Sequence, residues 1–206
     1  MTQIIALTGN PGAGQSTVAG IIGELVPAVR YSLEQAAAAE CAQAWGVDGR
    51  LFTTRAIRDV SLEQLAMGRC RDPGFRSFAW ELGLAPSAKP RVILGRWHTY
   101  RRQTDPAFSL YPAIELAATM AQAARVVQPR VLVITDVWYP NEVAWVKHCG
   151  GVLWCVTSAT RRDPTSPRIG APALTCMLAD QTISNDGSLE ELRMRVADLV
   201  AGVEVA

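Results

Sequence analysis

A glycine-rich turn between an apolar run and an amphipathic segment constrains this chain more than any other feature. The apolar run Ile4–Thr8 is followed directly by GNPGAG at Gly9–Gly14, and apolar residues then recur at helical spacing through Gln15–Val26. This pattern predicts a buried strand, a tight turn and a helix. Glycines let the backbone curl so that successive N–H groups face a phosphate, and the following helix adds the positive end of its dipole.

Two later apolar runs extend this prediction to a sheet. Val131–Thr135 and Val152–Val156 are expected to be buried strands, and Asp136 follows the first of them at once. Helices are expected at Gln15–Val26, Leu33–Trp45, Arg91–Arg102, Ala113–Val127, Asn141–His148 and Leu189–Val200. Strands that alternate with helices predict an α/β fold. We expect a mainly parallel sheet with helices on both faces.

The remaining segments are less regular. A helix is expected around Leu62–Met67, and a loop at Asp72–Gly74. A stretch rich in Arg, Pro, Thr and Ser spans about residues 158–172 and is expected to form a small lid-like loop. No long linker divides the chain, so we expect a single domain over residues 1–206.

Composition excludes several classes of protein. The chain has 206 residues, 49% hydrophobic and 19% charged, which excludes a disordered or collagen-like chain and is enough for a substantial core. The net charge is +1, so no global basic field indicates nucleic-acid binding. No apolar run approaches a membrane span and no basic segment precedes the first apolar run, so neither a membrane partner nor secretion is expected.

Cysteine and histidine usage gives no metal pattern. The five cysteines include no C-x-x-C pair, and the two histidines lie far apart in the sequence. We therefore expect neither a zinc site nor a disulfide scaffold, and a cytoplasmic location.

The glycine-rich turn fits the phosphate-loop pattern G-x-x-x-x-G-K-[ST] at every fixed position but one. The residues expected to hold ATP are Gly9, Asn10, Gly12, Ala13, Gly14, Gln15, Ser16 and Thr17. The Ser16 hydroxyl is expected to ligate Mg²⁺. Gln15 stands where the pattern has lysine, so the positive charge that lysine places on the β- and γ-phosphates is missing. Either an arginine compensates, or turnover is slow, or the protein only binds nucleotide.

Other candidate residues follow the strands or form one basic cluster. Asp136 is expected to serve Mg²⁺ or accept the acceptor's proton, with a turn cap as the alternative. Arg161 and Arg162 occupy positions in the sequence that are typical of lid arginines that close over ATP. The alternative is that both are solvated surface residues. In Arg96–Arg102, cations alternate with aromatics, so that Trp97, Arg101 and Arg102 can stack on a base and hold phosphates. An ordinary helix with a buried Trp97 is the alternative there.

Four segments together resemble one known family of kinases. They are LTGNPGAGQST at Leu7–Thr17, TDVWYPNE at Thr135–Glu142, Gly150–Val152 and the closing Ile183–Leu192. On these segments the chain resembles the deoxynucleoside monophosphate kinases of tailed phages, over nearly its whole length. The family has Asp-Val-Arg-Phe-Pro-Asn-Glu where this chain has TDVWYPNE. A related branch of the family phosphorylates the hydroxymethyl group of 5-hydroxymethyl-deoxyuridine in phage DNA.

Departures from the family pattern bear on the acceptor. Trp138 replaces the family's arginine, Tyr31–Ala36 lacks its lysine, and Trp97-His-Thr stands for its Trp-Gly-Thr-Glu. Several of these changes remove cations that hold an acceptor monophosphate. A base hydroxymethyl group within a polymer does not need them, so the departures favour the branch that acts on DNA.

The resemblance implies that the α/β fold is of the P-loop NTPase, nucleotide kinase-like type and that residues 1–206 form a single P-loop kinase domain. It also implies an enzyme that uses ATP and Mg²⁺. The expected activity is transfer of the γ-phosphate to a deoxynucleotide-type acceptor, with 5-hydroxymethyl-deoxyuridine in phage DNA as the best candidate. The alternatives are a soluble deoxynucleoside monophosphate kinase and a nucleotide-binding protein that lost catalysis with the lysine. Trp138, Asn141 and Glu142 are expected to contact substrate by analogy with the family motif. A phage-encoded chain would act in the host cytoplasm, and the oligomeric state, a homodimer included, stays open.

Overall fold

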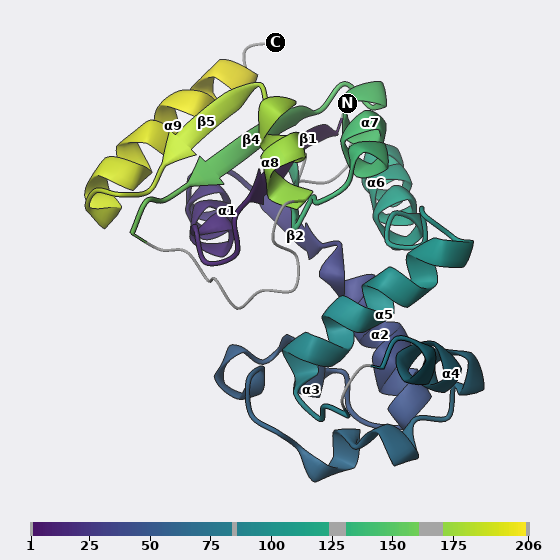
Figure 1. Cartoon of the computed structure of the whole chain (residues 1–206). Coiled ribbons are helices and arrows are strands. Elements are labelled where there is room, and N and C mark those ends of the chain that lie inside the picture. Colours follow the sequence, from purple (N-terminus) through teal and green to yellow (C-terminus); the bar gives the residue numbers. More distant parts are fainter. Residues whose placement is uncertain (1, 84–85, 124–130, 161–170, 205–206) are drawn as a thin grey trace. The chain divides into compact units, whose positions relative to one another are not determined.

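The structure is a computed structural model that describes residues 2–83, 86–123, 131–160 and 171–204. The described residues form a five-stranded sheet in the order β2-β3-β1-β4-β5, and all neighbouring strands run parallel (Figure 1). The strands are β1 Gln3–Gly9, β2 Ala28–Ser32, β3 Val131–Thr135, β4 Val152–Thr157 and β5 Gln181–Ser184. The described residues therefore have the predicted α/β fold, with an all-parallel sheet.

The helices largely follow the predicted segments. They are α1 Gln15–Leu25, α2 Glu34–Trp45, α3 Arg50–Thr53, α4 Pro73–Glu81, α5 Pro90–Thr104, α6 Tyr111–Ala123, α7 Pro140–His148, α8 Ala171–Met177 and α9 Leu189–Glu204. Short 3-10 turns at Arg55–Ile57, Glu63–Leu65 and Met67–Arg69 lie between α3 and α4. Among these described helices, none is long and apolar enough to cross a membrane.

Helices cover both faces of the sheet. Successive strand residues point to opposite faces, and on one face Leu7 and Trp154 form a core with α1 and α9. On the other face, α7 and α8 pack against β4 and β1. A Cβ atom at Gly151, where the chain passes from α7 to β4, would lie 2.9 Å from the Cβ of Ile4 and 3.0 Å from a methyl carbon of Val146. Only glycine permits this close approach of α7 to the central strand.

The chain divides into two compact units. Unit 1 comprises Met1–Leu33 with Leu110–Ala206 and contains the sheet, and unit 2 comprises Glu34–Ser109. Unit 2, blue to teal in Figure 1, is helical and has its own aromatic core. The rings of Trp45, Phe75 and Trp97 pack there with centroids 4.8 to 6.1 Å apart. The single domain with a lid stays a prediction, because residues 161–170 lie outside the described residues.

Two local predictions are wrong. Asp72–Gly74 is not a loop but the start of α4: the Asp72 carboxylate accepts a hydrogen bond of 2.7 Å from the Phe75 N–H, and Pro73 lies in the first turn. Aspartate before proline is a helix-start signal, because the carboxylate caps N–H groups and proline needs no donor there. Leu62–Met67 forms 3-10 turns instead of a helix. The edge strands β2 and β5 and helix α8 were not predicted.

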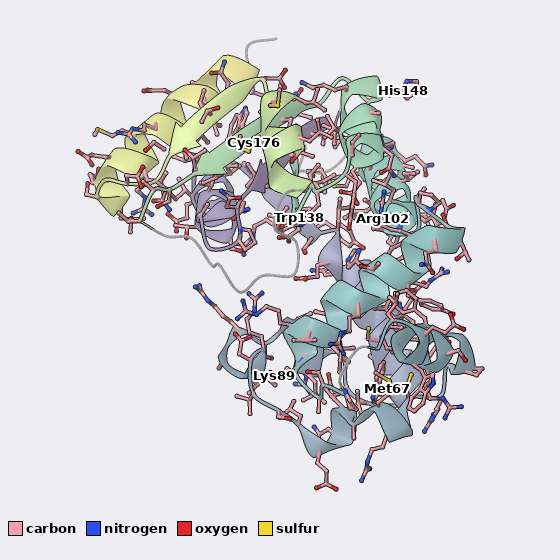
Figure 2. The ribbon with its side chains drawn as sticks, viewed as in Figure 1. Met67, Lys89, Arg102, Trp138, His148 and Cys176 are labelled. Atoms are coloured by element: carbon pink, nitrogen blue, oxygen red, sulfur yellow. A yellow bond between two sulfur atoms is a disulfide. The ribbon has the colours of Figure 1, made fainter. Side chains whose placement is uncertain are left out.

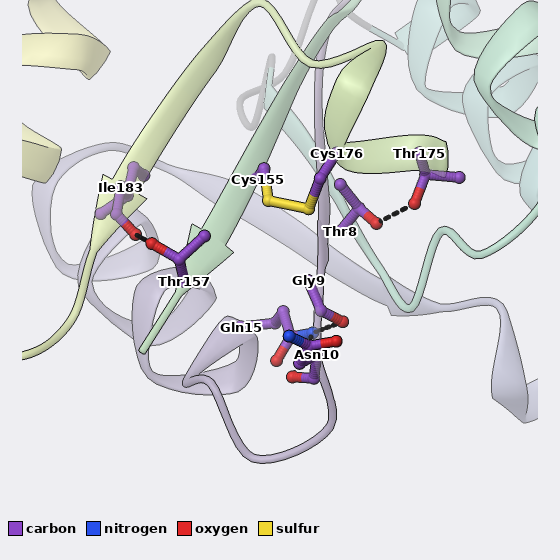
Figure 3. Close-up of a disulfide and its surroundings, with 9 residues drawn as sticks. All are labelled: Thr8, Gly9, Asn10, Gln15, Cys155, Thr157, Thr175, Cys176 and Ile183. Atoms are coloured by element: carbon purple, nitrogen blue, oxygen red, sulfur yellow. Dashed lines mark hydrogen bonds between the residues drawn. A yellow bond between two sulfur atoms is a disulfide. The ribbon is translucent and has the colours of Figure 1, made fainter. Parts of the chain in front are cut away.

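A disulfide joins β4 to α8. Cys155 of β4 bonds to Cys176 of α8, and the hydroxyls of the adjacent Thr175 and of Thr8 lie 2.6 Å apart (Figure 3). Thr8 pairs with Cys155 in the sheet register, so consecutive residues of α8 are tied to neighbouring positions of β1 and β4. Cysteine counting predicted no disulfide scaffold and did not predict this single bond. Free cysteines remain elsewhere: Cys41, Cys70 and Cys149.

Loss of the disulfide should destabilise unit 1. Cys155 and Cys176 are 21 residues apart, and a cross-link over a loop of this length contributes about 3 kcal/mol by limiting the unfolded chain. Cys176→Ser should therefore lower the free energy of unfolding by about that amount in urea titrations, and a thiol reductant should do the same to the wild type. The exposed, free Cys149 is the control, since Cys149→Ser should change stability by less than about 0.5 kcal/mol. Equal stability of oxidised and reduced protein would contradict a stabilising role for the bond.

Candidate nucleotide-binding site

The turn after β1 has the backbone that a phosphate loop needs. Gly9, Gly12 and Gly14 all have positive φ angles, of 145°, 86° and 112°. A Cβ at Gly9 would lie 2.1 Å from the Val156 carbonyl oxygen, so a side chain there is excluded by β4 as well as by the backbone angle. The turn ends at Gly14, directly before α1, and its N–H groups are therefore presented at a helix N-terminus.

Gln15 is folded back onto the loop. Its side chain is 7% exposed, and Nε2 donates hydrogen bonds to the carbonyl oxygens of Gly9, at 2.8 Å, and Asn10, at 3.3 Å (Figure 3). The amide therefore stabilises the curled loop from within. It supplies no positive charge to a bound phosphate, because glutamine is neutral.

Asn185, just beyond β5, fastens the loop from the other side. It is 3% exposed, its Nδ2 donates to the Ala13 carbonyl oxygen at 2.7 Å, and its own N–H donates to the Thr157 carbonyl oxygen at 2.8 Å. A Cβ at Gly14 would lie 2.3 Å from the Asn185 Nδ2, so the third glycine is also needed for this contact. Sequence reasoning missed this role of Asn185.

Ser188 is the residue that caps α9. Its hydroxyl accepts from the Glu191 N–H at 3.2 Å, and its N–H donates to the Glu191 carboxylate at 2.8 Å. This reciprocal pair is a capping box, and it leaves Asn185 free to serve the loop.

Asp136 lies at the carboxyl end of β3 in an unusual backbone conformation. Its φ angle is 63°, and it is the one described residue other than glycine with a positive φ. The left-handed region costs about 1–3 kcal/mol for a residue with a side chain and is found preferentially at functional sites. The following Val137 N–H donates to the Leu7 carbonyl oxygen at 3.2 Å, which places the chain after β3 beside the end of β1. Asp136 and the phosphate loop thus follow neighbouring strands at the same edge of the sheet.

The residues present fit a magnesium–nucleotide complex but not an all-protein metal cage. Within the described parts of the chain, no three His, Cys, Asp or Glu side chains gather as a metal site. Mg²⁺ at nucleotide sites is held by one or two protein oxygens together with phosphate oxygens and water. The exposed hydroxyl of Ser16 and the half-buried carboxylate of Asp136 offer these oxygens.

Trp138 and Glu142, which the family motif placed at the substrate, are parts of the α7 terminus. Glu142 is 1% exposed, and its Oε2 accepts from the backbone N–H groups of Trp138, at 2.8 Å, and Tyr139, at 3.1 Å. Trp138 is 7% exposed and lies in unit 1 (Figure 2). Asn141 is half-buried in the first turn of the helix. The Glu142 carboxylate therefore has a structural function in this chain whether or not it also meets a substrate.

The basic and aromatic cluster of α5 belongs to unit 2. Trp97 and Arg101 line a cavity of about 450 Å³ and both donate to one carboxylate. The Trp97 indole N–H lies 2.7 Å from Glu40 Oε2, and Arg101 reaches both oxygens of Glu40, at 2.9 and 3.1 Å. Arg102, near the end of α5, donates to the Pro106 carbonyl oxygen at 2.6 Å (Figure 2). Both arginines are thus engaged within unit 2.

Tyr100 adds a phenol to the same cavity. Its hydroxyl donates to Asp72 at 3.3 Å. Burial, together with the nearby Asp72 carboxylate, raises the pKa of the Tyr100 phenol above its ordinary value. The phenol therefore stays protonated and acts as a hydrogen-bond donor at neutral pH.

The two ends of the predicted lid-like loop are fixed to unit 1. At its start, Asp186 accepts from the Ala159 N–H at 2.7 Å and from the Ser158 hydroxyl at 2.9 Å. These donors, the Ala159 N–H first, lower the pKa of Asp186 below its ordinary value. At its end, α8 is held by the disulfide described above. Arg161 and Arg162 lie outside the described residues, so their predicted roles stay predictions.

Comparison with known proteins gives only remote similarities. No protein-family model and no curated protein matches the chain. Among solved structures, it is similar to shikimate kinase from Aquifex aeolicus, with 12% identity over 99% of both chains and a TM-score of 0.45. It is also similar to TT1252 from Thermus thermophilus, with 18% identity over 98% of this chain and 97% of that chain and a TM-score of 0.47. An unliganded sugar kinase from Janibacter sp. shows 12% identity over 98% and 95% of the two chains, with a TM-score of 0.41. Similarities this weak identify no activity.

Replacing Glu142 tests its capping role. Glu142→Ala leaves two backbone donors at the α7 terminus without their acceptor, so it should lower the free energy of unfolding by about 1–3 kcal/mol. Glu142→Gln keeps a side-chain carbonyl that still accepts, so its loss should be smaller. Urea titrations of both variants provide the measurement. A Glu142→Ala variant of full stability would show that the carboxylate is not needed as a cap.

Proposed function

We propose that the chain binds ATP at Gly9–Thr17 and transfers its γ-phosphoryl group to a deoxynucleotide-type acceptor. The observation that carries the proposal is the placement of Asp136 beside the glycine loop, at the carboxyl edge of adjacent parallel strands β1 and β3. Ligands of open α/β sheets bind at this edge. The N–H groups of the loop hold the phosphates, and the Asp136 carboxylate serves the ion or the acceptor hydroxyl.

The phosphates, the ion and the acceptor hydroxyl each have a proposed partner in this chain. Backbone N–H groups of the loop bind the phosphate oxygens, and Ser16 and Thr17 are exposed at the start of α1. Asp136 orients the acceptor hydroxyl or takes its proton. Mg²⁺, when bound, neutralises charge that develops on the transferred group. Arg161 and Arg162 are proposed to add positive charge there, in place of the lysine that Gln15 replaces.

For the acceptor, we propose the hydroxymethyl group of 5-hydroxymethyl-deoxyuridine in phage DNA. The support is the loss of the family's monophosphate-binding cations at Trp138 and Tyr31–Ala36. The base would be flipped out of the stack or presented single-stranded. Trp97 and Arg102 remain proposed acceptor contacts.

The hydrogen bonds of Gln15 favour one alternative function. Because Nε2 is already bonded to the carbonyl oxygens of Gly9 and Asn10, the side chain holds the loop in shape without any nucleotide. A loop held in shape in this way is sufficient for a protein that binds a nucleotide and does not turn it over. A soluble deoxynucleoside monophosphate kinase is the other alternative, and it differs from the primary proposal only in the acceptor.

Gln15→Lys should strengthen ATP binding. An ammonium group at this position can keep the contacts with the Gly9 and Asn10 carbonyl oxygens and add a charge-assisted hydrogen bond to phosphate. The expected gain is about tenfold in the dissociation constant, which equals about 1.4 kcal/mol, with faster turnover. Isothermal titration with ATP and Mg²⁺ measures the first effect. Gln15→Met keeps the length without donor or charge and is the control. Weaker binding by the lysine variant would show that the site depends on glutamine.

Parallel assays with two acceptors test the proposed reaction. Labelled ATP is offered with dTMP and with single-stranded DNA that contains 5-hydroxymethyluracil. The Asp136→Asn variant is the inactive control, and its kcat should fall by about two to four decades.

The salt dependence of acceptor affinity separates the two acceptors further. A DNA acceptor contacts several phosphates, so its affinity should fall with salt by about 0.7 log units per log unit of salt for each contact. A free monophosphate should show a much shallower slope. Phosphorylation of dTMP alone would support the soluble kinase instead. No labelled product from either acceptor, together with ATP binding in the titration, would support the binding protein.

A further inference from the structure

Two hydroxyl groups converge on a single oxygen of Asp136. The Ser32 hydroxyl donates to Asp136 Oδ2 at 2.6 Å, and the Thr135 hydroxyl donates to the same Oδ2 at 2.8 Å. The first distance falls in the range of a charge-assisted O–H···O⁻ bond. Oδ1 accepts no hydrogen bond from the described residues. The carboxylate is thus held by one oxygen and open at the other.

Ser32 reaches Asp136 because of the sheet register. It is the last residue of β2 and pairs with Thr135, the last residue of β3. The next N–H, that of Leu33, donates to the Thr135 carbonyl oxygen at 3.2 Å, which keeps the two strand ends together. Ser32 is half-buried and 104 positions away from Asp136 in the sequence. Its hydroxyl is therefore brought to the carboxylate by the fold and not by a local turn.

The backbone conformation of Asp136 indicates that this contact does more than join two strands. A residue in the left-handed region, here at φ 63°, keeps that conformation only where its surroundings enforce it. Groups that orient a metal-binding carboxylate from behind change metal affinity about 10- to 100-fold when they are removed. Two donors on Oδ2 fix the plane of the carboxylate and leave Oδ1 as the oxygen for an ion.

We propose that Ser32 is a positioning residue for Asp136, holding Oδ2 so that Oδ1 alone serves the divalent cation of the bound nucleotide. This proposal rests on the proposed function, because it concerns the cation that accompanies ATP. Ser32 touches neither nucleotide nor acceptor in it. Its effect passes entirely through the Asp136 carboxylate.

The test measures metal affinity without catalysis. Free Mn²⁺ is followed by electron paramagnetic resonance while the ion is titrated into the full chain with a non-hydrolysable ATP analogue. Ser32→Ala should weaken Mn²⁺ binding in this complex by about tenfold, and Ser32→Thr, which keeps the hydroxyl, should restore it. Affinity for the analogue in the presence of EDTA should be unchanged in both variants. Ser32→Cys closely matches serine in size and has a weaker donor, so its Mn²⁺ affinity should fall between those of the wild type and Ser32→Ala. This variant replaces Ser32→Ala in the test if the alanine variant fails to fold.

Two comparisons identify the route of the effect. The double variant Ser32→Ala with Asp136→Asn should bind Mn²⁺ no more weakly than Asp136→Asn alone, because Ser32 acts through Asp136. Ser184→Ala is the matched control: Ser184 also ends a strand and its hydroxyl donates to an aspartate, Asp186, at 3.0 Å. It should leave Mn²⁺ affinity unchanged.

The outcomes separate this proposal from the proposed function. If the wild type binds neither the analogue nor Mn²⁺ with it, the proposed function fails and the role of Ser32 fails with it. If the wild type binds both and Asp136→Asn loses the ion while Ser32→Ala keeps full affinity, only the role of Ser32 is overturned. An additive loss in the double variant overturns it too, because Ser32 would then act independently of Asp136.

Discussion

Parallel pairing of β1 with both β3 and β4 is the constraint on which the rest of the structure depends. Because all these strands run the same way, their carboxyl ends meet at one edge of the sheet. The glycine loop, Asp136 and Asn185 follow three different strands and still lie at that edge. The same pairing buries β1 on both faces, which explains its continuous apolar sequence. A site assembled in this way needs residues from distant parts of the chain.

The sequence predicted the centre of the fold better than its edges. Ile4–Thr8 and Val131–Thr135 are buried on both faces, so their apolar runs are continuous and easily recognised. Strand β2, Ala28–Ser32, is an edge strand of half-buried and exposed residues, and β5 is likewise at an edge. Neither has a clear apolar pattern, since water replaces protein on one side. The start of α4 could have been predicted, because Asp72 before Pro73 is a capping pattern typical of a helix start.

The sequence accounts for the local geometry of the glycine loop but not for the long-range contacts around it. Positive φ angles at the loop glycines follow from the motif, because the motif is local. The contacts of Asn185 with Ala13 and of Ser32 with Asp136 join residues more than a hundred positions apart. No spacing rule predicts such pairs without knowledge of the strand order. The disulfide between Cys155 and Cys176 was missed for the same reason, since counting cysteines says nothing of which ones the sheet brings together.

Under the proposed function, a glycine loop held by a neutral amide has a consequence for selectivity among nucleotides. A lysine in the loop raises the binding affinity with each additional phosphate charge, so it strengthens the preference for a triphosphate over a diphosphate. Gln15, bonded inward to Gly9 and Asn10, contributes little to that preference. Backbone N–H groups then recognise mainly the phosphates nearest the loop, which ATP and ADP share. The chain is therefore expected to discriminate weakly between them, and product would compete with substrate for the same loop.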